Sequence, residues 1–96
     1  MDQLERIAHM EGILNRGREA VDALEQALED YAAVREELAE LDAYYSGDLW
    51  RRDYDDDAAG RIPKDLKRGV LSEDAVYDLL TDRDRLRGRL EELGRD

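Results

Sequence analysis

Four aspartates stand within five residues near the middle of the chain, at a spacing that could bind a divalent cation. Asp53, Asp55 and Asp57 alternate with other residues in the pattern that opens a calcium-binding loop. Such a loop also needs a glycine at its sixth position and a glutamate at its twelfth, where this chain has Ala58 and Lys64. We therefore interpret the cluster as a solvated acidic surface. A weak cation site at the three aspartates is the alternative.

The chain offers little for nucleophilic or cofactor chemistry. It has no cysteine and a single histidine, His9. Its only serine and threonine residues are Ser46, Ser72 and Thr81, and we expect both serines to cap helices. Its glycines form no phosphate-binding loop. We therefore predict no catalytic residue and no cofactor, and we expect a protein that is not an enzyme.

The net charge of −11 is distributed unevenly. Residues 1–45 hold four basic and twelve acidic residues, whereas residues 61–71 hold four basic residues and one acidic residue. Because an acidic chain repels phosphate backbones at long range, we expect no nucleic-acid partner. No apolar run reaches the roughly 18 residues that span a bilayer, and Asp2 and Glu5 do not suit a signal peptide. We therefore expect a soluble cytoplasmic protein with no membrane partner.

Apolar residues recur at steps of mostly three and four, the spacing of a coiled-coil stripe, over the first half of the chain. The stripe consists of Leu4, Ile7, Met10, Leu14, Val21, Leu24, Leu28, Tyr31, Val34, Leu38, Leu41 and Tyr45. Gly17 occupies a stripe position and Gly12 lies nearby, and each glycine costs about 1 kcal/mol in a helix interior. Because no proline intervenes and the stripe resumes in phase, we predict one helix over residues 4–45. A turn at these glycines, giving two helices, is the alternative.

A short helix is predicted next, over residues 47–59. Ser46 suits its N-cap, and Gly60 suits the position just past its end. Large side chains gather in this part of the chain, where we expect them to close the end of a helical bundle: Tyr44, Tyr45, Leu49, Trp50 and Tyr54.

A C-terminal helix over residues 73–93 should follow a turn around residues 63–69. Ser72 would cap this helix, and Leu71 would pack on Val76 as a hydrophobic staple. Its stripe would consist of Val76, Leu79, Arg83, Leu86, Leu90 and Leu93. Its arginines oppose the acidic long helix, which favours an antiparallel return: Arg83, Arg85, Arg87 and Arg89.

The predicted fold is therefore all-α, with a single helical domain over residues 1–96. At 1.5 Å per residue the long helix would span about 60 Å and the C-terminal helix about 30 Å. The C-terminal helix can then cover only about half of the long apolar stripe. Either a bend or a second chain must shield the rest, and we expect a homodimer through the long helix.

The segment YYSGDLWRRDYDDDAAGRIPKDLKRGVLSEDAVYDLL, from Tyr44 to Leu80, resembles the diagnostic region of the domain of unknown function 4298 family. The resemblance is carried by the Tyr-Tyr pair, Trp50, the D-Y-x-x-D run of Asp53, Tyr54 and Asp57, Gly60, Pro63, and the segment DLKRGVLSED from Asp65 to Asp74. It implies a short bacterial protein whose signature lies in residues 44–80. No activity is established for that family, so the resemblance implies no catalytic or cofactor residue.

The basic side chains of this segment run against the acidic charge of the rest of the chain. Helix capping does not require the charges of Lys64, Lys67 and Arg68, so we expect a variant with glutamine at all three positions to fold. We hypothesise a protein–protein interaction module whose candidate partner-binding residues are Trp50, Tyr54, Lys64, Lys67 and Arg68. In a competing interpretation, the basic residues only neutralise the neighbouring aspartates.

Two other functions remain open at this point. The carboxylates of Asp53 to Asp57 could serve a small metal-dependent protein or enzyme. Alternatively, the acidic long helix could mimic nucleic acid and occupy a basic partner protein.

Overall fold

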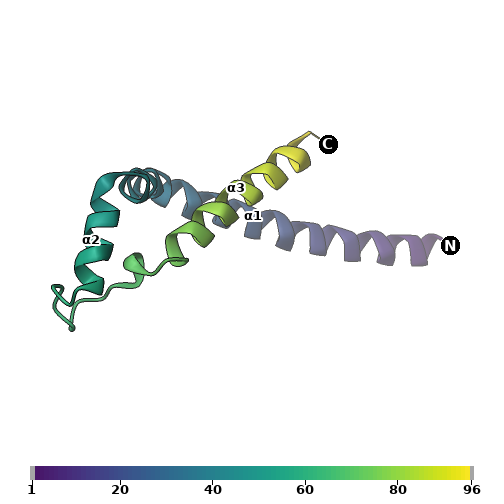
Figure 1. The fold of residues 1–96 in the computed structure, drawn as a ribbon. Coiled ribbons are helices and arrows are strands. Elements are labelled where there is room, and N and C mark those ends of the chain that lie inside the picture. Colours follow the sequence, from purple (N-terminus) through teal and green to yellow (C-terminus); the bar gives the residue numbers. More distant parts are fainter. Residues whose placement is uncertain (1, 96) are drawn as a thin grey trace. The chain divides into compact units, whose positions relative to one another are not determined.

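A computed structural model describes residues 2–95, which form three α-helices and one short 3-10 helix, with no strand among the described residues (Figure 1). The helices are α1 (Gln3–Ser46), α2 (Asp48–Ala58) and α3 (Ala75–Gly94), and the 3-10 helix η1 (Gly69–Leu71) precedes α3. The predicted all-α class and all three helices are confirmed, and the bounds of each differ from the predicted ones by at most two residues.

Helix α1 is continuous through Gly12 and Gly17, so the prediction of one long helix is confirmed and the alternative of a turn is wrong. It begins where the Asp2 side chain accepts the backbone N–H of Glu5, at 2.8 Å, as an N-cap residue does. No residue of α1 is buried. Helices in folded proteins owe most of their stability to packing of an apolar face, so α1 receives little of that stabilisation from its own chain.

The contacts divide the chain into two compact units, one ending at Glu36 and the other beginning at Glu37. The first unit is the N-terminal part of α1. The second contains the end of α1, α2, η1 and α3, with η1 contacting both α2 and α3. Its buried core consists of Leu71, Val76 and Leu80.

The C-terminal helix returns to the end of α1 within this second unit. The guanidinium of Arg83 donates to the Asp42 carboxylate at 3.3 Å, and the Arg83 side chain is only 14% exposed. Arg85 pairs with Asp82 of its own helix instead, at 3.6 Å. Charge pairing between the two helices, as predicted from sequence, is therefore confirmed at Arg83.

The apolar stripe of α3 lies slightly differently from the predicted one. Val76 and Leu80 are buried, whereas Leu79 is 46% exposed. The prediction of Leu79 as a core position is therefore wrong, because η1 and the end of α1 lie on the side of α3 that carries residues 76, 80 and 83. Spacings of three and four both fit a helical period of 3.6, so the sequence could not distinguish Leu79 from its neighbour.

Neither predicted capping serine takes the N-cap position of its helix. Ser46 is the last residue of α1 and donates its hydroxyl to Asp42, at 3.2 Å, while Gly47 takes the N-cap position of α2 without a side-chain bond. The expectation that Ser46 caps α2 is therefore wrong. Ser72 accepts the backbone N–H of Ala75, at 3.2 Å, but the N-cap position of α3 belongs to Asp74, two residues later, so Ser72 is not the N-cap residue either.

Gly60 ends α2 in the left-handed conformation, with φ of 75°. Its N–H donates to the carbonyl of Asp57 at 3.0 Å, and the N–H of Arg61 donates to that of Asp56 at 2.9 Å. These two bonds form a Schellman motif, which confirms the position predicted for this glycine. The side chains of Arg61 and Asp56 also pair, at 3.1 Å, where such motifs often have an apolar contact.

Replacing Gly60 with alanine should lower the free energy of unfolding by about 1–2 kcal/mol, because a Cβ is strained at this φ. The matched control is Gly88→Ala. Gly88 lies inside α3 with open space around its Cβ position, so alanine should raise the free energy of unfolding by about 1 kcal/mol. Urea denaturation followed by circular dichroism, at one protein concentration, measures both. Effects of the same sign would contradict the strained, left-handed role assigned to Gly60.

Candidate partner-binding site

The residues of α2 that make tertiary contacts lie on one face of that helix. Trp50, Asp53, Tyr54 and Asp57 follow each other at steps of three, one and three, which places them along one side of a helix. We call these four residues the α2 stripe. Two local features stabilise the ends of α2: the negative charge of Asp48 in its first turn and the Schellman motif at Gly60.

Three residues of the α2 stripe bind the segment that leads into α3. The Trp50 indole N–H donates to the backbone carbonyl of Val70, at 2.9 Å. The Tyr54 hydroxyl donates to Glu73, at 2.5 Å. Arg68 donates to Asp57, also at 2.5 Å, and both side chains are less than a third exposed. Residues 68–73 are thus attached to three successive positions of one helix face.

The fourth residue of the stripe binds α1. The Tyr44 hydroxyl donates to Asp53, at 2.7 Å. Beside this bond, Tyr45 meets Trp50 edge-on with ring centres 5.0 Å apart, and Trp50 stacks on Tyr54 at 5.1 Å. The predicted aromatic cluster is therefore confirmed for these three rings. Leu49, which was expected to join the cluster, is 58% exposed.

The hydrogen bonds perturb both tyrosines of this arrangement. Burial, together with the hydrogen bond to Asp53 and the charge of that carboxylate, raises the pKa of Tyr44 to about 12. The hydrogen bond to Glu73, aided by its charge, raises the pKa of Tyr54 above its usual value. Both phenols therefore stay protonated, and remain donors, across the neutral pH range.

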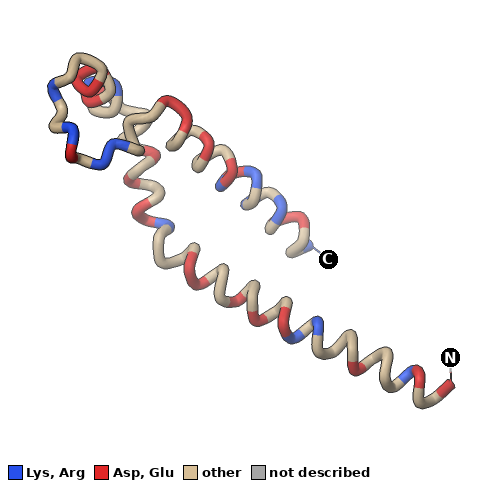
Figure 2. The backbone as a smooth tube through the Cα atoms, turned by 90° about the horizontal axis from the view of Figure 1, so that it is seen from below, with Lys and Arg blue, Asp and Glu red and all other residues tan. Residues whose placement is uncertain are grey.

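Basic residues follow one another along the segment between α2 and η1 (Figure 2), and their contacts divide them into two kinds. Arg61 and Arg68 pair with aspartates of α2, which confirms for these two the interpretation that basic residues neutralise the acidic cluster. Lys64 and Lys67 are exposed, and neither forms an ion pair with any residue that the structure describes. Of the predicted partner-binding residues, these two lysines alone have charges without a partner in the described part of the chain.

The aspartate cluster lies on α2 rather than in a loop. Asp53 accepts from Tyr44 and Asp57 from Arg68, while Asp55 is exposed between them. Within residues 2–95, no three histidine, cysteine or acidic side chains are grouped so that they could hold a metal ion. The structure therefore does not bring the predicted cation ligands together.

Two participants in the site were not predicted from sequence. Glu73 was expected only to favour the N-terminus of the last helix, yet it accepts the Tyr54 hydroxyl. Val70 participates through its backbone carbonyl, which no residue type reveals. The sequence did carry one signal for this site. Residues that can form hydrogen bonds recur on α2 at steps of three and four, which places them on one face of the helix.

These features define a small all-α protein in which the central helix is attached by side-chain hydrogen bonds to the segment that follows it. The chain belongs to the family described as Domain of unknown function (DUF4298), whose model matches residues 7–92. The resemblance seen in the sequence is thereby confirmed. No curated protein and no solved structure matches the chain. No helix among the described residues is apolar over enough of its length to cross a membrane.

Arg68→Gln should lower the free energy of unfolding by about 1–2 kcal/mol, because it leaves the partly buried Asp57 without its charged donor. Lys67→Gln, one residue away, removes an exposed charge and should change stability by no more than about 0.5 kcal/mol. Urea denaturation followed by Trp50 fluorescence measures both variants. If Arg68→Gln lowered the free energy of unfolding no more than Lys67→Gln does, the ion pair between Arg68 and Asp57 would add no stability.

Tyr44 should make stability depend on pH in the alkaline range. Its pKa is about 12 in the folded chain and 10.0 as the ordinary value. A raised pKa stabilises the fold fully below pH 10 and loses that contribution as the pH rises towards 12. The stability difference between the parent chain and Tyr44→Phe should therefore shrink over this window, as measured by urea denaturation at several pH values. A constant difference would contradict this assignment.

Proposed function

We propose that this protein is a non-enzymatic protein–protein interaction module that forms a homodimer through α1. The exposed apolar stripe of α1 is the observation that carries the proposal. The exposed aliphatic side chains of the stripe before the unit boundary are between 42% and 76% exposed: Leu4, Ile7, Met10, Leu14, Val21, Leu24, Leu28 and Val34. A stripe of this length in water indicates an interaction surface. We also propose that the protein is bacterial and that it is located in the cytoplasm.

A second copy of the chain is the partner that the stripe fits best. Its residues repeat at coiled-coil positions, and matching stripes of two copies can interdigitate. Roughly 18 residues per chain would occupy the contacting and flanking positions between residues 4 and 34. This is just under the ~20–30 residues per side of a standard interface, so we expect dissociation in the micromolar range.

The second unit would present the contact surface for another protein. Trp50, Tyr54 and Arg68 form hydrogen bonds within the unit, so their role would be to position the segment between α2 and α3. Lys64 and Lys67 are exposed basic residues of this segment, and they would recognise an acidic surface of a protein partner.

The test places a charge in the stripe. Val21 is 64% exposed and lies on the stripe, whereas Ala23 is exposed on the other side of α1. Val21→Glu should weaken the dimer at least tenfold, because a buried carboxylate in the seam has no partner. Ala23→Glu adds the same charge outside the seam and should change the dissociation constant by less than about threefold, within 0.7 kcal/mol or so.

Light scattering over a range of micromolar concentrations measures the mass of each variant. The parent chain should approach twice its single-chain mass of 11.1 kDa, and Val21→Glu should not. Trp50 fluorescence should be the same in both, because the second unit does not contain the substituted residue. A parent chain that stays at 11.1 kDa throughout the range would refute the proposed dimer.

A further inference from the structure

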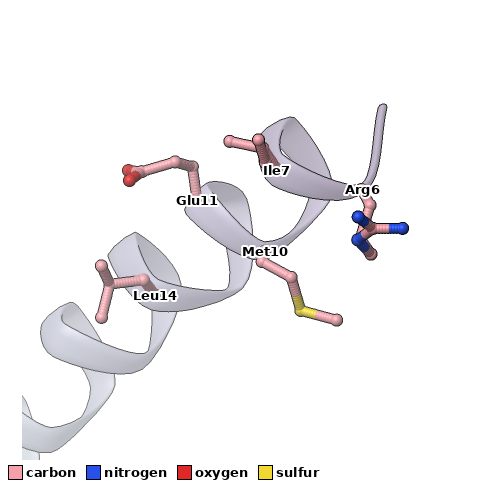
Figure 3. A pocket seen from close by; sticks show the side chains of 5 residues that line it. All are labelled: Arg6, Ile7, Met10, Glu11 and Leu14. Atoms are coloured by element: carbon pink, nitrogen blue, oxygen red, sulfur yellow. The ribbon is translucent and has the colours of Figure 1, made fainter. Parts of the chain in front are cut away.

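A shallow hollow lies on the surface of α1 near its N-terminus, lined by Arg6, Ile7, Met10, Glu11 and Leu14 (Figure 3). Three of these side chains are apolar and about half exposed. On a single helix such a hollow can only form between side chains of successive turns. What matters is therefore which side chain from another helix would fill it.

The residues around the hollow have the arrangement of a coiled-coil socket. In a heptad with Ile7 and Leu14 at position a, Met10 stands at d and Glu11 at e. In knobs-into-holes packing, each knob enters a hole formed by four residues of the facing helix. Ile7, Met10, Glu11 and Leu14 are such a set of four. The hollow therefore has the form of a site for one apolar side chain.

We propose that α1 forms a parallel, in-register coiled coil with α1 of a second copy, in which Met10 of each chain enters the hollow of the other. This inference rests on the proposed homodimer and adds its direction and register. In register, the d position of one chain faces the same d position of its partner, so Met10 is the residue opposite the hollow.

The two charges beside the hollow favour the parallel direction. Arg6 and Glu11 lie on different sides of the ribbon, at positions g and e (Figure 3). In a parallel pair the g side of one helix faces the e side of the other, so each Arg6 meets Glu11 of the second copy. In an antiparallel pair g faces g, and Arg6 would face a side that carries no other charge: Ile13, Ala20, Ala27 and Val34.

Residue shapes along the stripe decide the direction less than the charges do. Ile7 and Val21 are β-branched at position a, as parallel dimers favour, whereas Leu14 and Leu28 hold the other a positions. Beyond Tyr31 the a positions hold Arg35 and Asp42. Asp42 already pairs with Arg83 of its own chain. The seam between copies therefore covers residues 7–31.

Single cysteines test the direction cleanly, because the chain has none of its own. Met10→Cys should form a disulfide-linked dimer on mild oxidation, since in-register d positions bring the two sulfurs within bonding reach. Gly12→Cys is the matched control two residues away, on the outer side of α1. It should cross-link at least tenfold more slowly. Its added Cβ meets only the end of the Arg16 side chain, so α1 tolerates it.

A mixture of Met10→Cys and Leu28→Cys chains tests the opposite direction. In the antiparallel register that keeps residues 7–31 paired, Met10 faces Leu28 of the other chain, and the two Met10 positions are about 27 Å apart along the axis. The parallel proposal predicts that each variant links to itself. Predominant mixed disulfides would overturn it while leaving the dimer itself intact.

Charge exchange provides the second measurement, without oxidation. Arg6→Glu and Glu11→Arg should each weaken the dimer two- to fivefold, and the double variant should restore the parent dissociation constant. Failure of restoration, with a dimer of normal mass by light scattering, overturns the parallel register alone. A monomeric parent chain overturns this inference and the proposed function together.

Discussion

The hydrogen bond from the Trp50 indole to the backbone carbonyl of Val70 is the interaction on which the second unit depends. The buried core of the described chain comprises only Leu71, Val76 and Leu80, which is too little to fix a long connecting segment by burial. The segment must then be positioned by directed bonds. An indole N–H reaching a main-chain carbonyl fixes the backbone itself, whatever side chain stands at that position. Tyr54 and Asp57 of the α2 stripe bind two further residues of the same segment, Glu73 and Arg68.

Hydrogen bonds can position a segment because breaking one can cost more free energy than forming it contributes. An average bond contributes only about 1 kcal/mol net, but removing one partner leaves a partly buried group unsatisfied. This cost applies to the partly buried bond between Arg68 and Asp57, whereas the bonds of Trp50 and Tyr54 are exposed and act mainly by fixing where the segment lies. The N-terminal part of α1 has no buried residue, and its apolar stripe is exposed. The two units thus solve the problem of a small core in different ways.

The sequence predicted the helices well because helical spacing and helix-ending glycines are local signals. Gly60 is an example, since only a residue free of a Cβ accepts its conformation without strain. Prediction was poorer where the answer depends on a partner distant in sequence. Arg68 seemed dispensable for folding because its partner, Asp57, lies eleven residues earlier on another element. Leu79 and Leu80 were indistinguishable for a different reason, because periodicity locates the apolar side of a helix only to within one residue.

The pair formed by Asp42 and Arg83 distinguishes the end of α1 from the aliphatic heptads before it. Both residues stand where an apolar residue would continue the heptad, and Arg83 is largely shielded from water. Such a pair adds little net stability, because desolvating the charges offsets much of their attraction. It does penalise wrong pairings: an aliphatic layer from another chain placed over Asp42 would bury a carboxylate without its arginine. The polar pair thus reserves the end of α1 for α3, and in the proposed dimer only the aliphatic heptads before it would contact a second copy.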